Sequence, residues 1–328
     1  MPGHRTTNKM KRYNLFLPLV LFFTLLSSSK ALAQQKEEDL EALLNSTEKP
    51  KKEIVKGTFK ATHVINLQSP ELVSPGTLQF MIQHRFGPLN GGTGPFFNSY
   101  QFYGLDAAGI RFGFEYGVCK RLSVGVGRSS LNKNYDGYVK ATLLQQSKGG
   151  NGAIPFSVTY FGSVAATSLL PSYQSEYKYL SSRFAYTNQI IIASKVSERF
   201  SFEVVPTFIH FNQVVAATDP NDYLAIGFGA RFKLSKRVSF NAEYIYRIPP
   251  KDKLTPAYAG FYNSMSFGFD IETGGHVFQL MVTNSLGMYE ASFITQTNQR
   301  WGNGGIQLGF NISRDFVLNR KKVSGKNW

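Results

Sequence analysis

Residues 263–284 alternate between apolar and polar side chains on both sides of a short turn at 272–275. The first run reads SMSFGFDIE and the second reads VFQLMVT. A period of two places one set on one face of a strand and the other set on the opposite face. One face is apolar and often aromatic, and the other carries mostly carboxylates, amides and hydroxyls. The pattern demands a β-hairpin but does not decide between lipid and a water-soluble sandwich.

The same alternation recurs along the chain behind an export signal, which favours an all-β fold: a transmembrane, antiparallel, up-and-down β-barrel. Pro206 interrupts one of these segments and predicts a bulge with a switch of faces. Besides the two runs of the hairpin, the predicted strands are 77–87, 108–117, 121–130, 136–147, 154–168, 179–194, 199–213, 222–234, 237–247 and 305–316.

Residues 1–33 have the organisation of a secretory signal peptide. Four basic residues precede an apolar core at 15–26, which is too short to span a bilayer as a helix. Ala31, Leu32 and Ala33 then form a small-residue cleavage site. The alternative is an uncleaved anchor. The single cysteine, Cys119, excludes an intrachain disulfide.

The expected signal holds five of the 36 lysines and arginines and none of the 21 acidic residues, so the rest of the chain has 31 basic residues and a net charge of +10. Export argues against a nucleic-acid partner for this excess. The charge suits lipopolysaccharide phosphates on the outside or an anionic solute in the lumen. Outer-membrane lipid and lipopolysaccharide are therefore the expected surroundings, and the Gram-negative outer membrane is the expected location.

The segments that flank the strands predict separate roles. Residues 34–53 are polar and charged and are expected to form a periplasmic tether, with docking of a periplasmic protein as the sharper interpretation. Residues 54–76 are expected to lie in the lumen or at the periplasmic mouth. The transmembrane β-barrel is predicted at 77–316, and residues 317–328 are predicted to be a basic, solvated tail.

Short and long connections alternate along most of the predicted barrel, as short periplasmic turns and long outer loops do. Counting from 77–87 to 305–316 predicts twelve strands, an even number. The alternative is fourteen strands, in which 54–66 and 289–296 also span. The last strand ends near Phe316, and an amphipathic last strand with an aromatic end resembles the signal read by the outer-membrane assembly machinery.

Several stretches carry a family resemblance: GLDAAGIRFGFEYGV, RLSVGVGRSS, DPNDYLAIGFGARFKLSKRVSFNAEYIY, GFDIETGGHVFQLMVTNS and GFNIS. Through them nearly the whole chain after the signal resembles a β-barrel family of Bacteroidota that is classed as a domain of unknown function. The resemblance implies an outer-membrane barrel in a Gram-negative cell. It brings no substrate, reaction or cofactor, so it assigns no functional residues.

The polar face of the strands supplies the candidate site residues, which are expected to line the lumen. One interpretation is a set of mutually paired charges that are solvated or close the barrel. The other is a selectivity lining for a small anionic or polar solute. The candidates are Arg85, Arg111, Glu115, Arg183, Glu203, Arg231, Lys233, Glu243, Arg247, Asp270 and Glu272.

The sequence offers little for catalysis. The best-placed histidine, His84, faces the apolar side with Ser129 and Ser130 two strands away, which would suit a lipid hydrolase, but no G-x-S-x-G motif is present. No metal-ligand spacing, haem-attachment motif or phosphate loop occurs, so neither a cofactor nor an enzyme is predicted. The predicted function is a narrow channel or uptake component. The alternatives are a structural or assembly barrel with a closed lumen and a periplasmic partner, and, remotely, the hydrolase.

Overall fold

The computed structural model describes residues 52–89, 102–169, 179–214, 219–250 and 260–319. The predicted signal peptide, nearly all of the tether at 34–53 and most of the tail at 317–328 lie outside the described residues. The fold below concerns one compact unit, which comprises residues 53–148 and 152–328. Among the described residues, no helix is long and apolar enough to cross a membrane.

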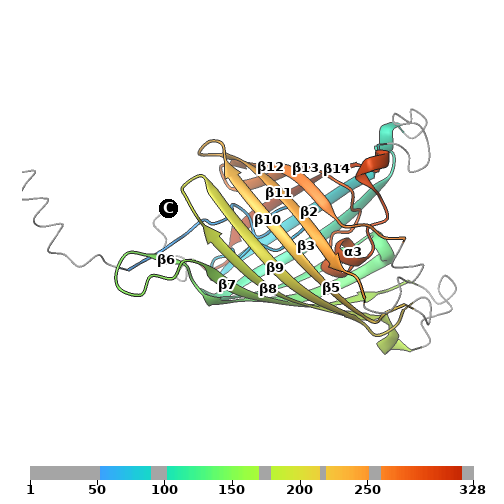
Figure 1. Cartoon of the computed structure of the whole chain (residues 1–328), viewed down its shortest axis with the longest axis horizontal. Helices are drawn as coiled ribbons and strands as arrows, with labels where there is room; N and C mark the ends of the chain where they lie inside the picture. The colour runs from blue at the N-terminus through green and yellow to red at the C-terminus, as the bar shows by residue number, and fades with distance from the viewer. Residues whose placement is uncertain (1–51, 90–101, 170–178, 215–218, 251–259, 320–328) are drawn as a thin grey trace, which may run out of the picture. The chain divides into compact units, whose positions relative to one another are not determined.

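Twelve antiparallel strands form a closed barrel in which each strand pairs with its neighbours in the chain and β14 pairs with β2. This confirms the predicted twelve-stranded, up-and-down architecture (Figure 1). The barrel strands are β2 (Thr77–Pro88), β3 (Ala108–Cys119), β4 (Leu122–Ser129), β5 (Asn134–Leu144), β7 (Ser157–Thr167), β8 (Phe184–Lys195), β9 (Phe200–Phe211), β10 (Asp222–Lys233), β11 (Val238–Ile248), β12 (Met265–Thr273), β13 (His276–Thr283) and β14 (Gln307–Val317).

The two ends of the barrel differ in their connections. At one end, β3–β4, β8–β9, β10–β11 and β12–β13 are joined by turns of two to four residues, and the barrel's first and last strands also begin and end there. A two-stranded ladder of β1 (Glu53–Ile54) and β6 (Ser147–Lys148) lies at the same end (Figure 1). Because outer-membrane barrels keep their short turns in the periplasm, this end is the periplasmic one.

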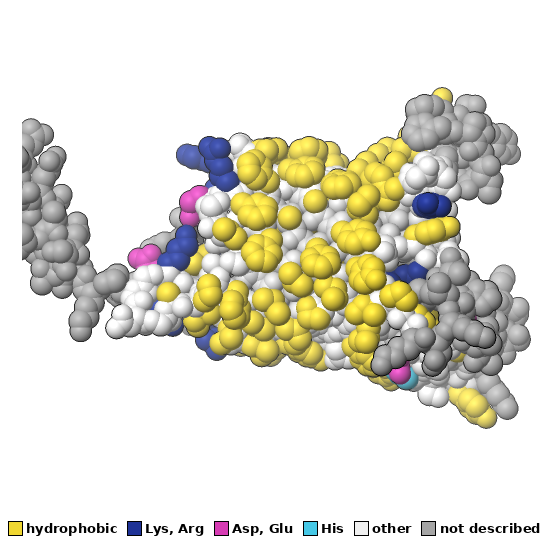
Figure 2. Space-filling view, viewed as in Figure 1, with side chains coloured by type: hydrophobic (Ala, Val, Ile, Leu, Met, Phe, Trp, Pro, Cys, Tyr) yellow, Lys and Arg dark blue, Asp and Glu magenta, His cyan; other side chains and the backbone are white. Residues whose placement is uncertain are grey.

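The outer face of the wall is apolar. Phe114 and Val126 are direct neighbours on β3 and β4, and their side chains are 44% and 59% exposed. Figure 2 shows hydrophobic side chains over the wall between the two ends, with charged side chains towards the ends. The barrel encloses its own interior, so no second sheet covers this surface. An apolar surface of this extent belongs in lipid, which excludes the sandwich.

Pro206 does not act as predicted. It faces outward in β9 and pairs with Ile226 of β10 in an unbroken register. The ladder between β8 and β9 skips the two positions around it, yet the pairs on either side keep one register. Proline lacks only the N–H that would bond one neighbour, so β9 loses ladder bonds without a bulge or a switch of faces.

Residues 57–76, here called the plug, run inside the barrel. They enter at the periplasmic end, turn back in a short hairpin where His63 pairs with Gln68, and leave again before β2. All residues from Thr58 to Ser69 except Lys60 are buried. The plug comes so close to the wall at Gly117 that a Cβ there would lie 2.1 Å from the carbonyl oxygen of Ser74.

A second segment closes the outer end of the lumen. Residues 284–306 fold inward after β13 and include α3 (Glu290–Thr295), in which every residue is buried. The fourteen-strand alternative, in which 289–296 would be a strand, is therefore wrong. The stretch lies within the lumen, where neither neighbouring strand edge is free to pair with it, and a helix satisfies its backbone groups internally.

An apolar core joins these two inserts to the wall. Leu67 of the plug and Phe293 and Ile294 of α3 cluster with inward-facing wall residues such as Ile209 and Ile245. The inner face is therefore not uniformly polar. The barrel buries this core as a soluble domain does, and burial of apolar area stabilises both inserts.

Candidate functional site: a plugged polar lumen

Glu243, one of the predicted lining residues, holds the tip of the plug. Its carboxylate accepts hydrogen bonds from the backbone N–H groups of Asn66 (2.9 Å) and Leu67 (3.0 Å) and from Asn66 Nδ2 (2.7 Å). The plug turns sharply at these residues, so the N–H groups have no partner in the hairpin itself. The buried carboxylate of β11 satisfies them and is itself satisfied.

Arg85 reaches the same tip from β2, four strands away from β11 in the barrel. Its Nη2 donates to Asn66 Oδ1 (2.8 Å), and its Nη1 donates to Asn311 Oδ1 (2.9 Å). Asn311 Nδ2 in turn donates to the carbonyl oxygen of Ile65 (3.0 Å). The side chain of Arg85 is fully buried. Strands β2, β11 and β14 therefore all bond to residues 65–67.

Lys140 anchors both limbs of the plug. Its Nζ donates to the carbonyl oxygens of Thr62 (2.9 Å) and Glu71 (3.0 Å). Lys140 was not among the predicted site residues, because its segment was too irregular for the two faces to be assigned. The inward positions of β5 include Asp136, Tyr138 and Lys140, whose period-two spacing was the signal that could have identified them.

A buried ion pair joins β3 to β5 on the inner face of the wall. Arg111 donates to both oxygens of Asp136, through Nε (3.0 Å) and Nη2, and to Gln83 Oε1 (2.8 Å). Glu115 accepts from the hydroxyls of Ser123 and Tyr138 instead of from a base. The wall charges are thus satisfied largely by polar neighbours and by the plug, and less by one another.

Glu203 and Asp270 also face inward. Both carboxylate oxygens of Glu203 are buried and have no hydrogen-bond partner among the described residues. Asp270 accepts from Gln279 Nε2 (2.8 Å), which also bonds the plug carbonyl of Val64 (3.0 Å). Gly229 leaves room for Glu203, since a Cβ there would lie 2.8 Å from its Cγ.

The remaining predicted residues lie at the two mouths. At the periplasmic mouth, Arg231 donates to the carbonyl oxygens of plug residues 57 and 58, Glu272 pairs with Lys60, and Lys233 faces the opening. At the outer mouth, Arg247 donates to the carbonyl oxygens of residues 261 and 295. Arg183 lies there too, in η3 (Leu180–Arg183) instead of a strand, and donates to carbonyls at 167 and 169.

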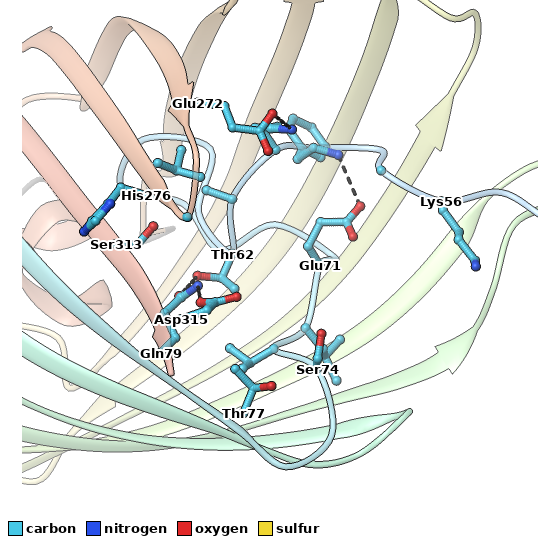
Figure 3. A pocket seen from close by; sticks show the side chains of 18 of the residues that line it. Lys56, Thr62, Glu71, Ser74, Thr77, Gln79, Glu272, His276, Ser313 and Asp315 are labelled. Carbon is cyan, nitrogen blue, oxygen red and sulfur yellow. Dashed lines mark hydrogen bonds and ion pairs between the residues drawn. The ribbon is translucent and has the colours of Figure 1, made fainter. Parts of the chain in front are cut away.

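In the described part of the chain, a cavity lies on each side of the inserts. The periplasmic cavity, here called the vestibule, has a volume of about 760 Å³ and is bounded by the plug, the inner wall and the turns. Figure 3 shows Thr62 and Glu71 of the plug facing this space together with Gln79, Glu272 and Asp315 of the wall. The outer cavity is smaller, about 340 Å³, and is lined by residues around η3 and α3.

Two carboxyl groups of the inserts have raised pKa values: Glu71, which is half-buried at the edge of the vestibule, and Glu290, which is buried. Burial raises the pKa of Glu71 above its ordinary value, although the N–H of Phe59 and the nearby Lys140 act in the opposite direction. Burial likewise raises the pKa of Glu290 in α3, whose carboxylate accepts from Gln68 Nε2 (2.9 Å). Through that bond the plug and α3 touch inside the lumen.

The histidine and serines considered for a lipid hydrolase do not come together in the structure. His84 is paired with Ile110 on the outer face and stacks on Phe310, with ring centroids 4.9 Å apart. Ser129 is fully buried and pairs with Arg111, so it points to the lumen. Ser130 accepts a hydrogen bond from the N–H of Ile110 (2.9 Å). Among the described residues, no group of three or more His, Cys, Asp or Glu is placed to hold a metal ion.

Comparisons with solved structures returned other outer-membrane barrels. A KdgM porin in complex with disordered oligogalacturonate is 8% identical, covers 74% of this chain and 99% of its own, and has a TM-score of 0.42. A NanC porin is 8% identical, with 73% and 98% coverage and a TM-score of 0.44. An outer membrane channel from Pseudomonas putida F1 is 10% identical, with 75% and 97% coverage and a TM-score of 0.40. These values are too low to support an argument about function.

A comparison with curated proteins found no match. A family described as a membrane-bound beta barrel domain (DUF5777) matches residues 59–316, a range that begins two residues inside the plug and ends one residue before the end of β14. A membrane-bound barrel with a lipid-facing apolar wall and short turns at one end is located in the outer membrane of a Gram-negative cell. The chain belongs to this family of membrane-bound β-barrel domains.

Proposed function

We propose that this protein is a narrow, gated channel or uptake component for a small polar or anionic solute. The proposal is supported by the nature of the segments that separate the two cavities. These segments are the plug and the α3 segment, and neither contributes a strand to the barrel. Withdrawal of these inserts would leave the twelve-stranded wall with all its pairings. In the state described here the channel is closed.

The strength of the closure determines how the channel behaves. Hydrogen bonds to charged groups contribute roughly 1.5–3 kcal/mol each. Glu243, Arg85 and Lys140 all bond the plug in this way, and Leu67 adds apolar burial. Spontaneous opening is therefore rare, because several kcal/mol correspond to a very small open population. A ligand or partner that favours the open state has to supply the free energy that separates the open state from the closed one.

Conductance in planar bilayers tests the proposal with three forms of the protein. Wild type is expected to show rare openings. A released form, Glu243→Ala with Lys140→Ala, is expected to conduct more often. A locked form carries Thr62→Cys and Gln79→Cys, whose native oxygen atoms lie 3.0 Å apart, bridged by a short bifunctional thiol reagent. It is made with Cys119→Ser, because Cys119 is exposed and would react. The reagent is a bis-methanethiosulfonate, which links each cysteine through a disulfide, so the locked form is expected to be silent until both disulfides of the bridge are reduced.

The competing candidate is a structural or assembly barrel whose lumen stays closed and whose periplasmic partner docks on residues 34–53, nearly all of which lie outside the described residues. The dense contacts of the plug with the wall favour it. A released form that migrates as a folded barrel in unheated gel electrophoresis yet does not conduct would contradict the channel. Co-purification of a periplasmic protein, lost on removal of residues 34–53, would then support the competing candidate.

A further inference from the structure

The vestibule is lined by more basic than acidic side chains. Six bases face it against four acids, Glu71, Glu198, Glu272 and Asp315. The acids are largely engaged: Glu272 pairs with Lys60, Glu198 pairs with Lys195, and Asp315 accepts from Gln79. The six bases are Lys56, Lys60, Lys195, Arg231, Lys233 and Lys236.

Three of these bases are lysines that form no ion pair with a described residue. Lys56, Lys233 and Lys236 have no ion-pair partner among the described residues. They come from separate elements, since Lys56 precedes the plug, Lys233 ends β10 and Lys236 lies in the following turn. Arg231 adds a guanidinium whose Nε is buried and lacks a hydrogen-bond partner in the described part of the chain. The charge is therefore concentrated around one space.

The size and walls of this space suit a small molecule. About 760 Å³ lies within the range of ligand-binding pockets. Hydroxyls and amides such as Thr62, Thr77 and Gln79 line it beside the bases. Low-dielectric walls around a cavity with an excess of one sign of charge strengthen its field and concentrate counter-ions within it. The vestibule thus combines unpaired cations, neutral hydrogen-bonding groups and an opening to the periplasm.

We propose that the vestibule binds a small solute carrying two or more carboxylate or phosphate groups, with Lys233, Lys236 and Lys56 as its charge partners and Arg231 at its inner end. The proposal deepens the proposed function, because it names the class of solute and the place where the closed barrel holds it. Binding here does not require the lumen to open. Binding and conduction can therefore fail independently.

The test is isothermal titration of the refolded protein in detergent with inorganic pyrophosphate, which carries two phosphate groups, and, separately, with the tricarboxylate tricarballylate. At low salt, saturable binding of at least one anion is expected, and its loss in about 500 mM salt is expected because the site is partly open to solvent. Lys233→Gln with Lys236→Gln should weaken binding by about tenfold or more, because two charges near the anion are lost. The pair of anions distinguishes phosphate from carboxylate recognition.

The matched control removes the same charge from the same end. Lys120→Gln with Arg121→Gln lies in the β3–β4 turn, and neither residue lines the vestibule. This variant should bind within about twofold of wild type, since its charges are more distant and screened. An absence of saturable binding to wild type for both anions, or an equal loss in both double variants, would overturn the proposal. Unheated gel migration verifies that each variant is folded.

Discussion

Glu243 and Asn66 are 177 residues apart in the chain and share two hydrogen bonds inside the barrel, one from the backbone N–H and one from the side-chain amide of Asn66. One residue belongs to the wall and the other to the tip of the plug. The contact shows how the closure is built: a buried strand carboxylate takes the place of the hydrogen-bond partners that a turn inside a lumen would otherwise lack.

Glu243→Ala is expected to loosen the plug. It removes three hydrogen bonds to a charged group and leaves the N–H groups of Asn66 and Leu67 buried without partners, so a loss of about 3 kcal/mol or more in the free energy of unfolding is expected. Protease cleavage within residues 57–69 should also become faster. Glu115→Gln is the control, because Glu115 is another buried wall glutamate but bonds only wall residues. Equal cleavage of the plug in both variants would contradict this account.

Gly227→Ala is expected to push on the plug directly. A Cβ at Gly227 would lie 2.9 Å from Cδ2 of Leu67, which is fully buried. Overpacking of this kind costs about 1–3 kcal/mol. Leu67→Ala should recover part of that loss when combined with Gly227→Ala, although it destabilises the protein alone. A double-mutant cycle on thermal unfolding in detergent measures the coupling. Simple additivity would show that the two residues do not meet.

Val126→Arg is expected to destabilise the barrel according to its depth in the bilayer. Val126 is exposed on the outer face in the middle of β4, where an arginine costs about 2–4 kcal/mol. Val118→Arg lies near the short-turn end of β3 and should cost at most about 1 kcal/mol. Refolding into lipid vesicles across a urea series compares the two variants. Equal costs would mean that the wall does not sit in lipid as described.

Glu71→Gln is expected to change how stability depends on pH. Burial raises the pKa of Glu71 in the folded state above its ordinary value of 4.5, so the folded protein binds this proton more tightly than the unfolded chain does. The stability that comes from binding this proton is fully present when the pH is below the ordinary pKa. It is lost as the pH rises through the raised pKa of the folded state. Glutamine cannot ionise, so the variant should lose less stability than wild type as the pH rises.

Thermal unfolding midpoints across a series from about pH 4 to about pH 8 provide the measurement, because the pKa of Glu71 is raised above its ordinary value in the folded state. The difference between variant and wild type should favour the variant more strongly at the higher pH. Glu53→Gln serves as the control, since Glu53 is exposed in β1 outside the lumen. A pH dependence that is the same for Glu71→Gln and wild type would show that the carboxyl of Glu71 does not contribute.

The side-chain orientations in much of the wall could be predicted from the local sequence. In β11 the outward set of Phe240 and Tyr244 and the inward set of Asn241 and Glu243 are those that the alternation predicts. Where one face becomes irregular, as around Lys140 in β5, the prediction did not recover the residues that hold the plug. Pro206 shows the opposite error, since a proline signal was given more weight than the continuing alternation around it.

The sequence by itself determined the wall, namely twelve amphipathic strands with their apolar faces outward, because side-chain period and turn spacing are local properties of the chain. Only the tertiary structure decided what fills the barrel. The alternation in 54–66 and 289–296 left open whether these segments span as strands, and their places depend on bonds such as that between Asn311 and Ile65, 246 residues apart. Such partners meet only once the wall has closed around them, so the closure of the lumen is a property of the assembled barrel.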